Sequence, residues 1–223
     1  MIGLTGATSR LGQAIMRLYP GVVVPIGRVM PAESLPVIIH AATIRGRSES
    51  DAAEFMPFND CVAEYATRHG SKVVNVGSCW QLLAGTCQDQ PYTRLKNQQE
   101  ALLPGAVHVY PYHIYGPSKG FVYEVKRHLQ GGSPLGFVGT FPLDLVYVDD
   151  VARACVSAVG LPTGRYAIAS GIPTRPLDLL NRYGLSAPVR DDVVTSELAY
   201  PLPIIGNTLV TVDDYLQDCI KVV

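Results

Sequence analysis

The sequence has little charge and no long apolar run, and each shortage excludes a class of protein. Charged residues make up 17% of the 223 residues, and the formal net charge is −1. A chain without excess positive charge has no general attraction to nucleic acid or to anionic membranes. No apolar run approaches the roughly 18 residues that a membrane-spanning helix needs. We therefore expect neither a nucleic-acid partner nor a membrane.

Cysteine is also scarce, and the N-terminus lacks the features of a targeting segment. The first residues have neither the basic start nor the apolar stretch of a signal peptide. Scattered cysteines, odd in number and outside metal-ligand spacing, favour reduced thiols and argue against a zinc site. They are Cys61, Cys79, Cys87, Cys155 and Cys219. These features predict a cytoplasmic protein without a bound metal.

Apolar residues, by contrast, make up 48% of the chain, which is enough for a substantial core. Short β-branched runs alternate with longer amphipathic stretches, which predicts an α/β fold: a Rossmann-like doubly wound parallel sheet with right-handed crossovers. Asp149 and Asp150 stand where an N-cap is expected before the fifth helix. The predicted strands are 2–4, 22–24, 37–41, 72–76, 107–110, 145–148 and 166–169. The predicted helices are 11–18, 59–68, 93–103, 121–129, 151–159 and 212–220.

The length favours a single domain, 1–223, with two functional parts. Residues 1–112 are expected mainly to bind a cofactor. From about Ser170 the sequence becomes Pro-rich and irregular, which indicates a small C-terminal lobe packed on the sheet. Residues 113–144 and 170–223 are expected mainly to form this substrate lobe.

A glycine-containing loop joins the first predicted strand to the first helix. Gly6 allows a tight turn, and Gly12 lets the helix pack closely on the sheet. The free N–H groups at the helix N-terminus then suit a pyrophosphate. Two glycines also fit a purely structural turn, but their place at the first strand–helix junction favours dinucleotide binding. The predicted cofactor contacts here are Gly6, Thr8, Ser9, Arg10, Leu11 and Gly12.

The choice of dinucleotide depends on the second strand, which is followed by Arg28 and not by a carboxylate. Arg10 in the glycine loop can reach the same corner. Two guanidinium groups suit a ribose 2′-phosphate, so we expect NADP(H) in preference to NAD(H). The alternative is that both are solvated surface arginines.

Tyr92 and Lys96 are four residues apart, so on a helix they share one face. A phenol with a pKa near 10 is a poor acid–base catalyst at neutral pH. A neighbouring ammonium stabilises the phenolate and lowers that pKa. This spacing is common on surface helices, but here it follows a buried strand that ends at Ser78.

With the loop Thr5–Gly12, Ser78 and the Tyr92/Lys96 pair, the sequence resembles the short-chain dehydrogenase/reductase superfamily, although Ser9 stands where a glycine is usual. The resemblance implies that Ser78 bonds the substrate oxygen and that Lys96 also bonds the nicotinamide ribose. It further implies that Asn59 supports a water relay to the lysine. A strand-end cap for Ser78 and a helix N-cap for Asn59 are the alternative roles.

Segments 37–43, 110–117 and 145–152 resemble the extended branch, the NAD-dependent epimerase/dehydratase family. Within it, the runs 39–47 and 77–81 look most like nucleotide-deoxysugar 4-ketoreductases. The resemblance implies further cofactor contacts from Ala41, Ala42, Thr43, Pro111 and Tyr112. It implies substrate contacts from Arg45, Ser78, Trp80 and His113.

Three departures separate the chain from that family. Residues 29–36 leave no room for the usual helix and third strand, so we expect the adenine pocket to be open or built from other residues. The arginine that commonly precedes the Tyr-Val-Asp-Asp run is missing, and His113 replaces a common asparagine. Either the substrate is smaller than a sugar nucleotide, or the nucleotide is held by other cations, such as Arg45, Arg47, Lys119 or Lys126.

The resemblance implies NADPH-dependent reduction of a ketone, a 4-keto deoxysugar nucleotide, with Tyr92 as the general acid. Dehydration is disfavoured, because Cys79 and Trp80 cannot supply the extra acid–base pair that the family's dehydratases use after the serine. The alternatives are a sugar-nucleotide epimerase that retains NAD(P) and a non-catalytic dinucleotide-binding regulator. A homodimer is common in the superfamily, and we expect one here by analogy alone.

Overall fold

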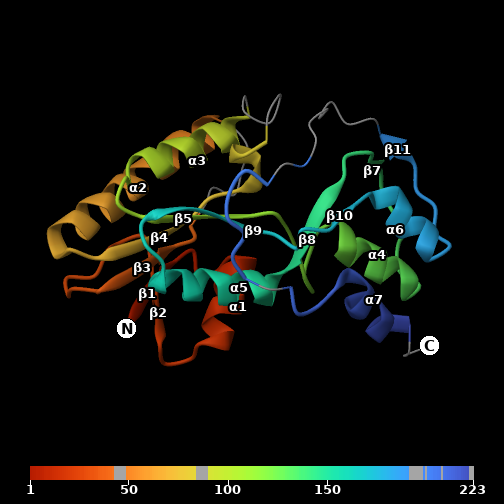
Figure 1. Ribbon diagram of the computed structural model, residues 1–223, viewed down its shortest axis with the longest axis horizontal. Coiled ribbons are helices and arrows are strands. Elements are labelled where there is room, and N and C mark those ends of the chain that lie inside the picture. The colour runs from red at the N-terminus through yellow and green to blue at the C-terminus, as the bar shows by residue number, and fades with distance from the viewer. Residues whose placement is uncertain (43–48, 84–89, 191–197, 199, 207, 221–223) are drawn as a thin grey trace.

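The computed structural model describes residues 1–42, 49–83, 90–190, 198, 200–206 and 208–220. Figure 1 shows a central sheet with helices on both faces, and a smaller group of strands and helices at one end. None of the helices in the described part of the chain is long and apolar enough to cross a membrane.

The central sheet has six strands in the order β2-β1-β3-β4-β5-β9. Every neighbouring pair is parallel, which confirms the predicted Rossmann-like fold class. The inner strands are buried on both faces, as their continuous apolar runs indicated. The strands are β1 (Ile2–Thr5), β2 (Val23–Ile26), β3 (Val37–His40), β4 (Lys72–Val76), β5 (Val107–Pro111) and β9 (Gly164–Ile168).

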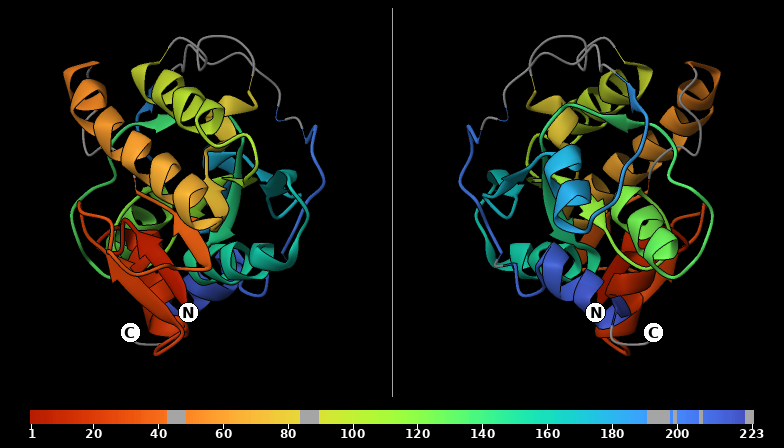
Figure 2. Two further views of the ribbon diagram at one scale, coloured as in Figure 1. Left: turned by 90° about the vertical axis from the view of Figure 1, so that its left-hand side faces the viewer. Right: turned by 90° about the vertical axis from the view of Figure 1, so that its right-hand side faces the viewer.

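Two pairs of helices cover the sheet. The helices α1 (Arg10–Leu18) and α5 (Val148–Ser157) pack together on one face, and α2 (Glu49–His69) and α3 (Pro91–Ala101) pack together on the other (Figures 1 and 2). The helix α1 turns its apolar stripe inward, including the buried Ile15. The main core lies between the sheet and the helices α1 and α5, and it includes Leu4, Ile15, Ile39, Val107, Val151 and Cys155. Smaller clusters lie under α2 and include Val62, Tyr65 and Ala66.

The helix α2 begins earlier than the sequence predicted. We expected a helix over 59–68, after Pro57, but Pro57 lies inside α2. Asn59 is consequently an interior residue of α2, and its predicted alternative role as an N-cap is wrong.

The segment 27–36, described throughout, is a loop, which confirms that the usual helix and third strand are missing. β2 is therefore the edge strand of the sheet. Tyr65 on α2 holds this loop by two hydrogen bonds: its hydroxyl accepts from the Leu35 N–H at 2.9 Å and donates to the Glu33 carbonyl. Ser71 Oγ donates to the Leu35 carbonyl at 2.6 Å.

A smaller lobe, at the right of Figure 1, contains two short sheets, ordered β10-β8-β6 and β11-β7. The strand predicted at 145–148 is β8 and belongs here, not to the parallel sheet. The strands are β6 (His113–Tyr115), β7 (Val138–Gly139), β8 (Leu143–Tyr147), β10 (Pro173–Thr174) and β11 (Val189–Arg190). The helices are α4 (Phe121–Leu129), α6 (Pro176–Arg182) and α7 (Val212–Ile220). The lobe has its own core, with Tyr115, Val125, Leu145, Leu179 and Leu216.

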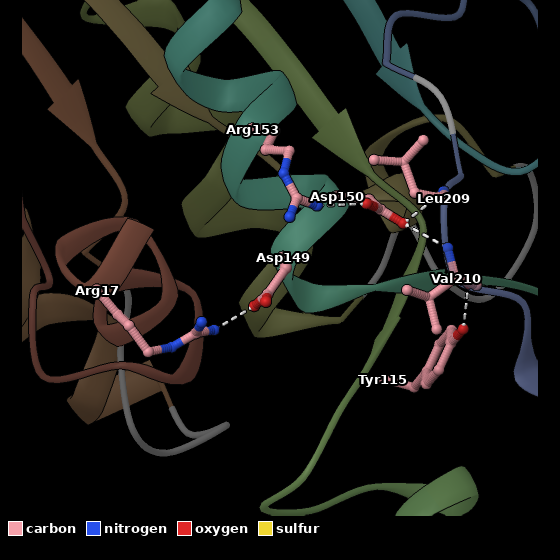
Figure 3. A network of polar contacts seen from close by, with 7 residues as sticks. All are labelled: Arg17, Tyr115, Asp149, Asp150, Arg153, Leu209 and Val210. Carbon is pink, nitrogen blue, oxygen red and sulfur yellow. Dashed lines mark hydrogen bonds and ion pairs between the residues drawn. The ribbon is translucent and has the colours of Figure 1, made fainter. Parts of the chain in front are cut away.

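The start of α5 corrects another expectation. The helix begins at Val148 with Tyr147 as N-cap, so Asp149 and Asp150 lie in its first turn and are not caps. Asp149 instead accepts a hydrogen bond from Arg17 on α1 at 2.5 Å, which joins the two helices (Figure 3).

Asp150 ties α5 to the C-terminal segment. Its buried carboxylate pairs with Arg153 at 2.8 Å and accepts from the backbone N–H of Leu209 at 2.9 Å and of Val210 at 3.3 Å (Figure 3). The Tyr115 hydroxyl donates to the Val210 carbonyl at 2.7 Å. These contacts hold the lobe against the end of the main sheet.

Candidate active site

Most of the residues predicted for cofactor binding and catalysis line one pocket of about 410 Å³. It opens beyond the carboxyl ends of the central strands, where open α/β sheets bind ligands. Among the predicted residues, the pocket lining includes Ser9, Arg10, Leu11, Ala41, Ser78, Trp80, Tyr92, Lys96, Pro111, Tyr112 and His113. Gly6, Thr8, Gly12, Arg28, Ala42 and Asn59 are not part of the lining. Thr43, Arg45 and Arg47 lie outside the described residues.

The two glycines of the loop are needed where they stand. Gly6 has a φ of +71°, and a Cβ there would lie 2.7 Å from the carbonyl oxygen of Ala41 and from the backbone of Ala42. A Cβ on Gly12 would overlap the backbone of Gly6 and Ala7. Both substitutions would force the loop away from the sheet, so the tight approach of α1 to β1 depends on these positions.

Ser9 is the N-cap of α1. Its Oγ accepts from the Gly12 N–H at 3.0 Å and so satisfies one of the free donors at the helix start. The Thr8 carbonyl accepts from the Gln13 side chain at 3.2 Å. Serine at the usual glycine position therefore has a local structural task besides any contact with phosphate.

Arg10 crosses from the loop to the lobe. Its two terminal nitrogens donate to the Lys119 carbonyl at 2.8 Å and to the Ile114 carbonyl at 2.6 Å. Burial lowers the pKa of Arg10. Arg28 is exposed in the loop after β2 and lies outside the pocket. Arg10 is thus bonded to the lobe, and Arg28 follows β2 as predicted. Their joint grip on a ribose 2′-phosphate stays a prediction.

Ser78 follows β4 and is the N-cap of a 3₁₀ turn, Cys79–Gln81. Its Oγ accepts from the Trp80 N–H at 3.4 Å, and its own N–H donates to Gln81 Oε1 at 2.9 Å. The cap predicted as an alternative role is thus present. It leaves the O–H of a pocket-lining hydroxyl able to donate, because a serine oxygen can accept and donate at once.

Tyr92 and Lys96 lie on α3, which begins with Pro91 at its first turn. The Tyr92 ring meets Trp80 edge-on, with ring centroids 6.2 Å apart. Lys96 is 3% exposed, and its Nζ donates to the Val76 carbonyl at 2.8 Å and to Gln99 Oε1 at 3.1 Å. Burial lowers the pKa of Lys96 to about 7. The ammonium therefore titrates near neutral pH.

Asn59 belongs to a buried chain of hydrogen bonds that the sequence did not reveal. The Ala42 N–H donates to Thr5 Oγ1 at 3.2 Å, and Thr5 Oγ1 lies 2.7 Å from His40 Nδ1. His40 Nε2 lies 3.0 Å from Asn59 Oδ1. Burial lowers the pKa of His40 to about 3, so the ring is neutral and its proton on Nε2 is donated to Asn59. The water relay from Asn59 to the lysine stays a prediction.

His113 is mostly buried in the pocket wall, and burial lowers the pKa of its ring. Within the described part of the chain, its Nδ1 has no hydrogen-bond partner. Such an atom is suited to a ligand in the pocket. Of the other cations considered, Lys119 lines the pocket. Lys126 lies in the lobe, with its Nζ 4.5 Å from the centroid of the Tyr215 ring.

The sequence missed several pocket residues and two supporting ones. Cys79 and Ile114 also line the pocket, as do Val76 and Gly77 at the end of β4. Because strand ends meet at this edge, the last residues of each predicted strand could have been proposed. The two supporting residues gave weaker signals. His40 is a polar side chain at the end of a buried strand, and Gln99 lies on the same face of α3 as Lys96.

Neither the family models nor the curated proteins give a match to this sequence. Solved structures do. UDP-N-acetylglucosamine 4-epimerase from Bacillus cereus superposes with a TM-score of 0.76 and 13% identity, over 99% of this chain and 95% of that one. A dTDP-4-dehydrorhamnose reductase from Clostridium acetobutylicum superposes with a TM-score of 0.67 and 15% identity, over 88% of this chain and 87% of that one.

The Bordetella bronchiseptica enzyme WbmG, in complex with NAD and UDP, gives a TM-score of 0.66 and 18% identity, over 92% of this chain and 84% of that one. At such identities the likeness concerns the fold. The chain has the fold of the extended short-chain dehydrogenases/reductases, as its motifs predicted.

Proposed function

We propose that the protein is an NAD(P)-dependent enzyme that acts on sugar nucleotides, and that it reduces a ketone of a 4-keto deoxysugar nucleotide. The observation that carries this proposal is that Ser78, Tyr92 and Lys96 line one pocket with the N-terminus of α1. The structural neighbours support it, because they include two kinds of sugar-nucleotide enzyme, an epimerase and a 4-dehydrorhamnose reductase.

The residues present fit a dinucleotide. Gly6 and Gly12 let α1 start close to the sheet, and the first residues of that helix, Arg10 and Leu11, line the pocket, where a phosphate can meet the helix N-terminus. Ala41 and Gly77 line the pocket with little bulk. Ser9, Leu11 and these small residues would hold the cofactor. When bound, the dinucleotide supplies the hydride for reduction of the ketone.

The chain itself supplies the proton chemistry. Tyr92 donates its phenolic proton to the substrate oxygen, and the Ser78 hydroxyl orients that oxygen by a hydrogen bond. The Lys96 ammonium, fixed by the Val76 carbonyl, stabilises the phenolate that remains. Trp80 and Tyr112 line the same pocket and supply apolar surface beside these groups.

The test is NADPH oxidation in the presence of nucleotide-linked 4-keto sugars that differ in base and ring configuration. We expect stoichiometric loss of NADPH and appearance of the 4-hydroxy sugar with at least one of them. Interconversion of sugar epimers without net loss of NADPH would replace the reductase with the epimerase. Binding of the dinucleotide without turnover of any member would favour the regulator.

The choice of NADPH is tested by ligand-induced thermal stabilisation. We expect a larger rise in Tm with NADPH than with NADH, because Arg28 follows the edge strand β2 where a ribose 2′-phosphate would lie. Arg28→Ala should remove the difference, whereas Arg190→Ala in the distant β11 should leave it unchanged. A larger rise with NADH would overturn the cofactor choice.

A further inference from the structure

A chain of hydrogen-bonded, buried polar side chains, called the file below, connects Lys96 to His108 through Gln99 and Asn75. Gln99 Oε1 accepts from Lys96 Nζ at 3.1 Å, and Gln99 Nε2 donates to Asn75 Oδ1 at 2.8 Å. Asn75 Nδ2 then lies 3.1 Å from His108 Nδ1. The four side chains come from α3, β4 and β5, and each has an exposed fraction of 6% or less. None of the last three takes part in the proton transfer proposed above.

The position of every proton in this file follows from its lysine end. An ammonium can only donate, so Gln99 must present its oxygen to Lys96 and its NH₂ to Asn75. Asn75 must accept with its oxygen and present its own NH₂ to His108. His108 Nδ1 must therefore accept. The ring also bonds the Leu103 backbone in a contact that raises its pKa, as a carbonyl acceptor does. His108 is thus neutral, with its proton on Nε2.

Protonation of His108 would break this order. Nδ1 would become a donor facing the Asn75 NH₂, and two facing donors cannot bond. The contact is restored only if the Asn75 amide turns over, which obliges the Gln99 amide to turn over as well. Gln99 would then present its NH₂ to the Lys96 ammonium. Such a mismatch between buried groups costs free energy, because an unpaired buried polar group has lost its hydrogen bonds to water without gaining others.

We propose that Gln99, Asn75 and His108 are positioning residues for Lys96, and that the two ordered amides make a charge on Lys96 and a second proton on His108 disfavour each other. The coupling is a property of the fold itself. Only its importance for catalysis rests on the proposed function of Lys96.

Other charged groups face the two ends of the file. Glu100 on α3 raises the pKa of His108 and Arg165 on β9 lowers it, and these two side chains are paired at 3.1 Å. Burial is the largest effect on His108 and lowers its pKa. At the other end, His40 on β3 faces Lys96 and is neutral, because burial lowers its pKa to about 3.

The test is an NMR titration of the histidine side chains, without cofactor or substrate. In the native protein, nitrogen shifts should identify neutral His108 as the Nε2–H tautomer. Lys96→Met should raise the pKa of His108 by about one pH unit, a roughly tenfold coupling. The side-chain NMR signals of His128, on the lobe helix α4, should be the same in every variant and serve as the control. An Nδ1–H tautomer in the native protein would overturn the proposal.

A second background separates the amide file from a through-space effect. In Gln99→Met the file is cut, so adding Lys96→Met should no longer shift the pKa of His108. An equal shift in both backgrounds would mean simple repulsion between the charges and would overturn the proposal.

If Gln99→Met does not fold, Gln99→Glu provides the test. A carboxylate cannot donate to Asn75, so the Asn75 amide should turn over and His108 should carry its proton on Nδ1. Retention of the Nε2–H tautomer would be the contrary result. Because no substrate is used, an inactive enzyme leaves the coupling testable, and absent coupling leaves the proposed activity standing.

Discussion

Tyr92→Phe is expected to reduce kcat for NADPH-dependent ketone reduction by about 10²- to 10⁴-fold, the usual contribution of a positioned acid–base group. The substitution removes the proton that the substrate oxygen receives and leaves the ring in place beside Trp80. Dinucleotide affinity should therefore change little, and the loss should appear in kcat and not in the binding of cofactor. The measurement is the rate of NADPH oxidation at saturating cofactor and substrate.

Tyr123→Phe is the matched control, because Tyr123 lies on α4 in the lobe and is not part of the pocket. Its kcat should match that of the native protein. Equal turnover in Tyr92→Phe and the native protein would mean that another group, or water, delivers the proton. The mechanism proposed for Tyr92 would then be wrong, while the fold and the dinucleotide loop would be unaffected.

The features that could be predicted from the sequence are those set by local periodicity. Continuous apolar runs between amphipathic stretches predicted the parallel sheet, and the four-residue spacing placed Tyr92 and Lys96 on one helix face. The steric demands at Gly6 and Gly12 also follow from local geometry, because a tight strand–helix turn admits no side chain. Each of these inferences needs only neighbouring residues.

The features that could not be predicted depend on partners far along the chain. Arg10 is held by the carbonyls of Ile114 and Lys119, more than 100 residues away, so nothing near it in sequence signals its direction. Asp149 looked like a cap because its partner, Arg17, is distant in sequence. The start of α2 was also misplaced, because the sequence placed the helix after Pro57, whereas the structure continues the helix through that residue.

Lys96→Met is expected to reduce kcat/KM at pH 7 by about 10²-fold or more, because the phenolate left on Tyr92 loses its stabilising charge. The pH dependence should identify that charge. Burial lowers the pKa of Lys96 to about 7, so the ammonium is present below that pH and is lost above it. In the native protein kcat/KM, which reports the free enzyme, should fall about tenfold per pH unit on the alkaline side. In Lys96→Met, kcat/KM should be low at every pH and should lack this decrease on the alkaline side.

The same lowered pKa has the opposite consequence for stability, and this provides the control. In the unfolded chain Lys96 titrates near its ordinary value of 10.5, so between pH 7 and that value the unfolded state binds more protons than the folded state. The free energy of unfolding should therefore rise with pH across this window, and in Lys96→Met that contribution should disappear. Urea denaturation at pH 7, 8 and 9 measures it. An alkaline loss of activity without the matching gain in stability would show that a group other than Lys96 is titrating, since one buried ammonium must produce both.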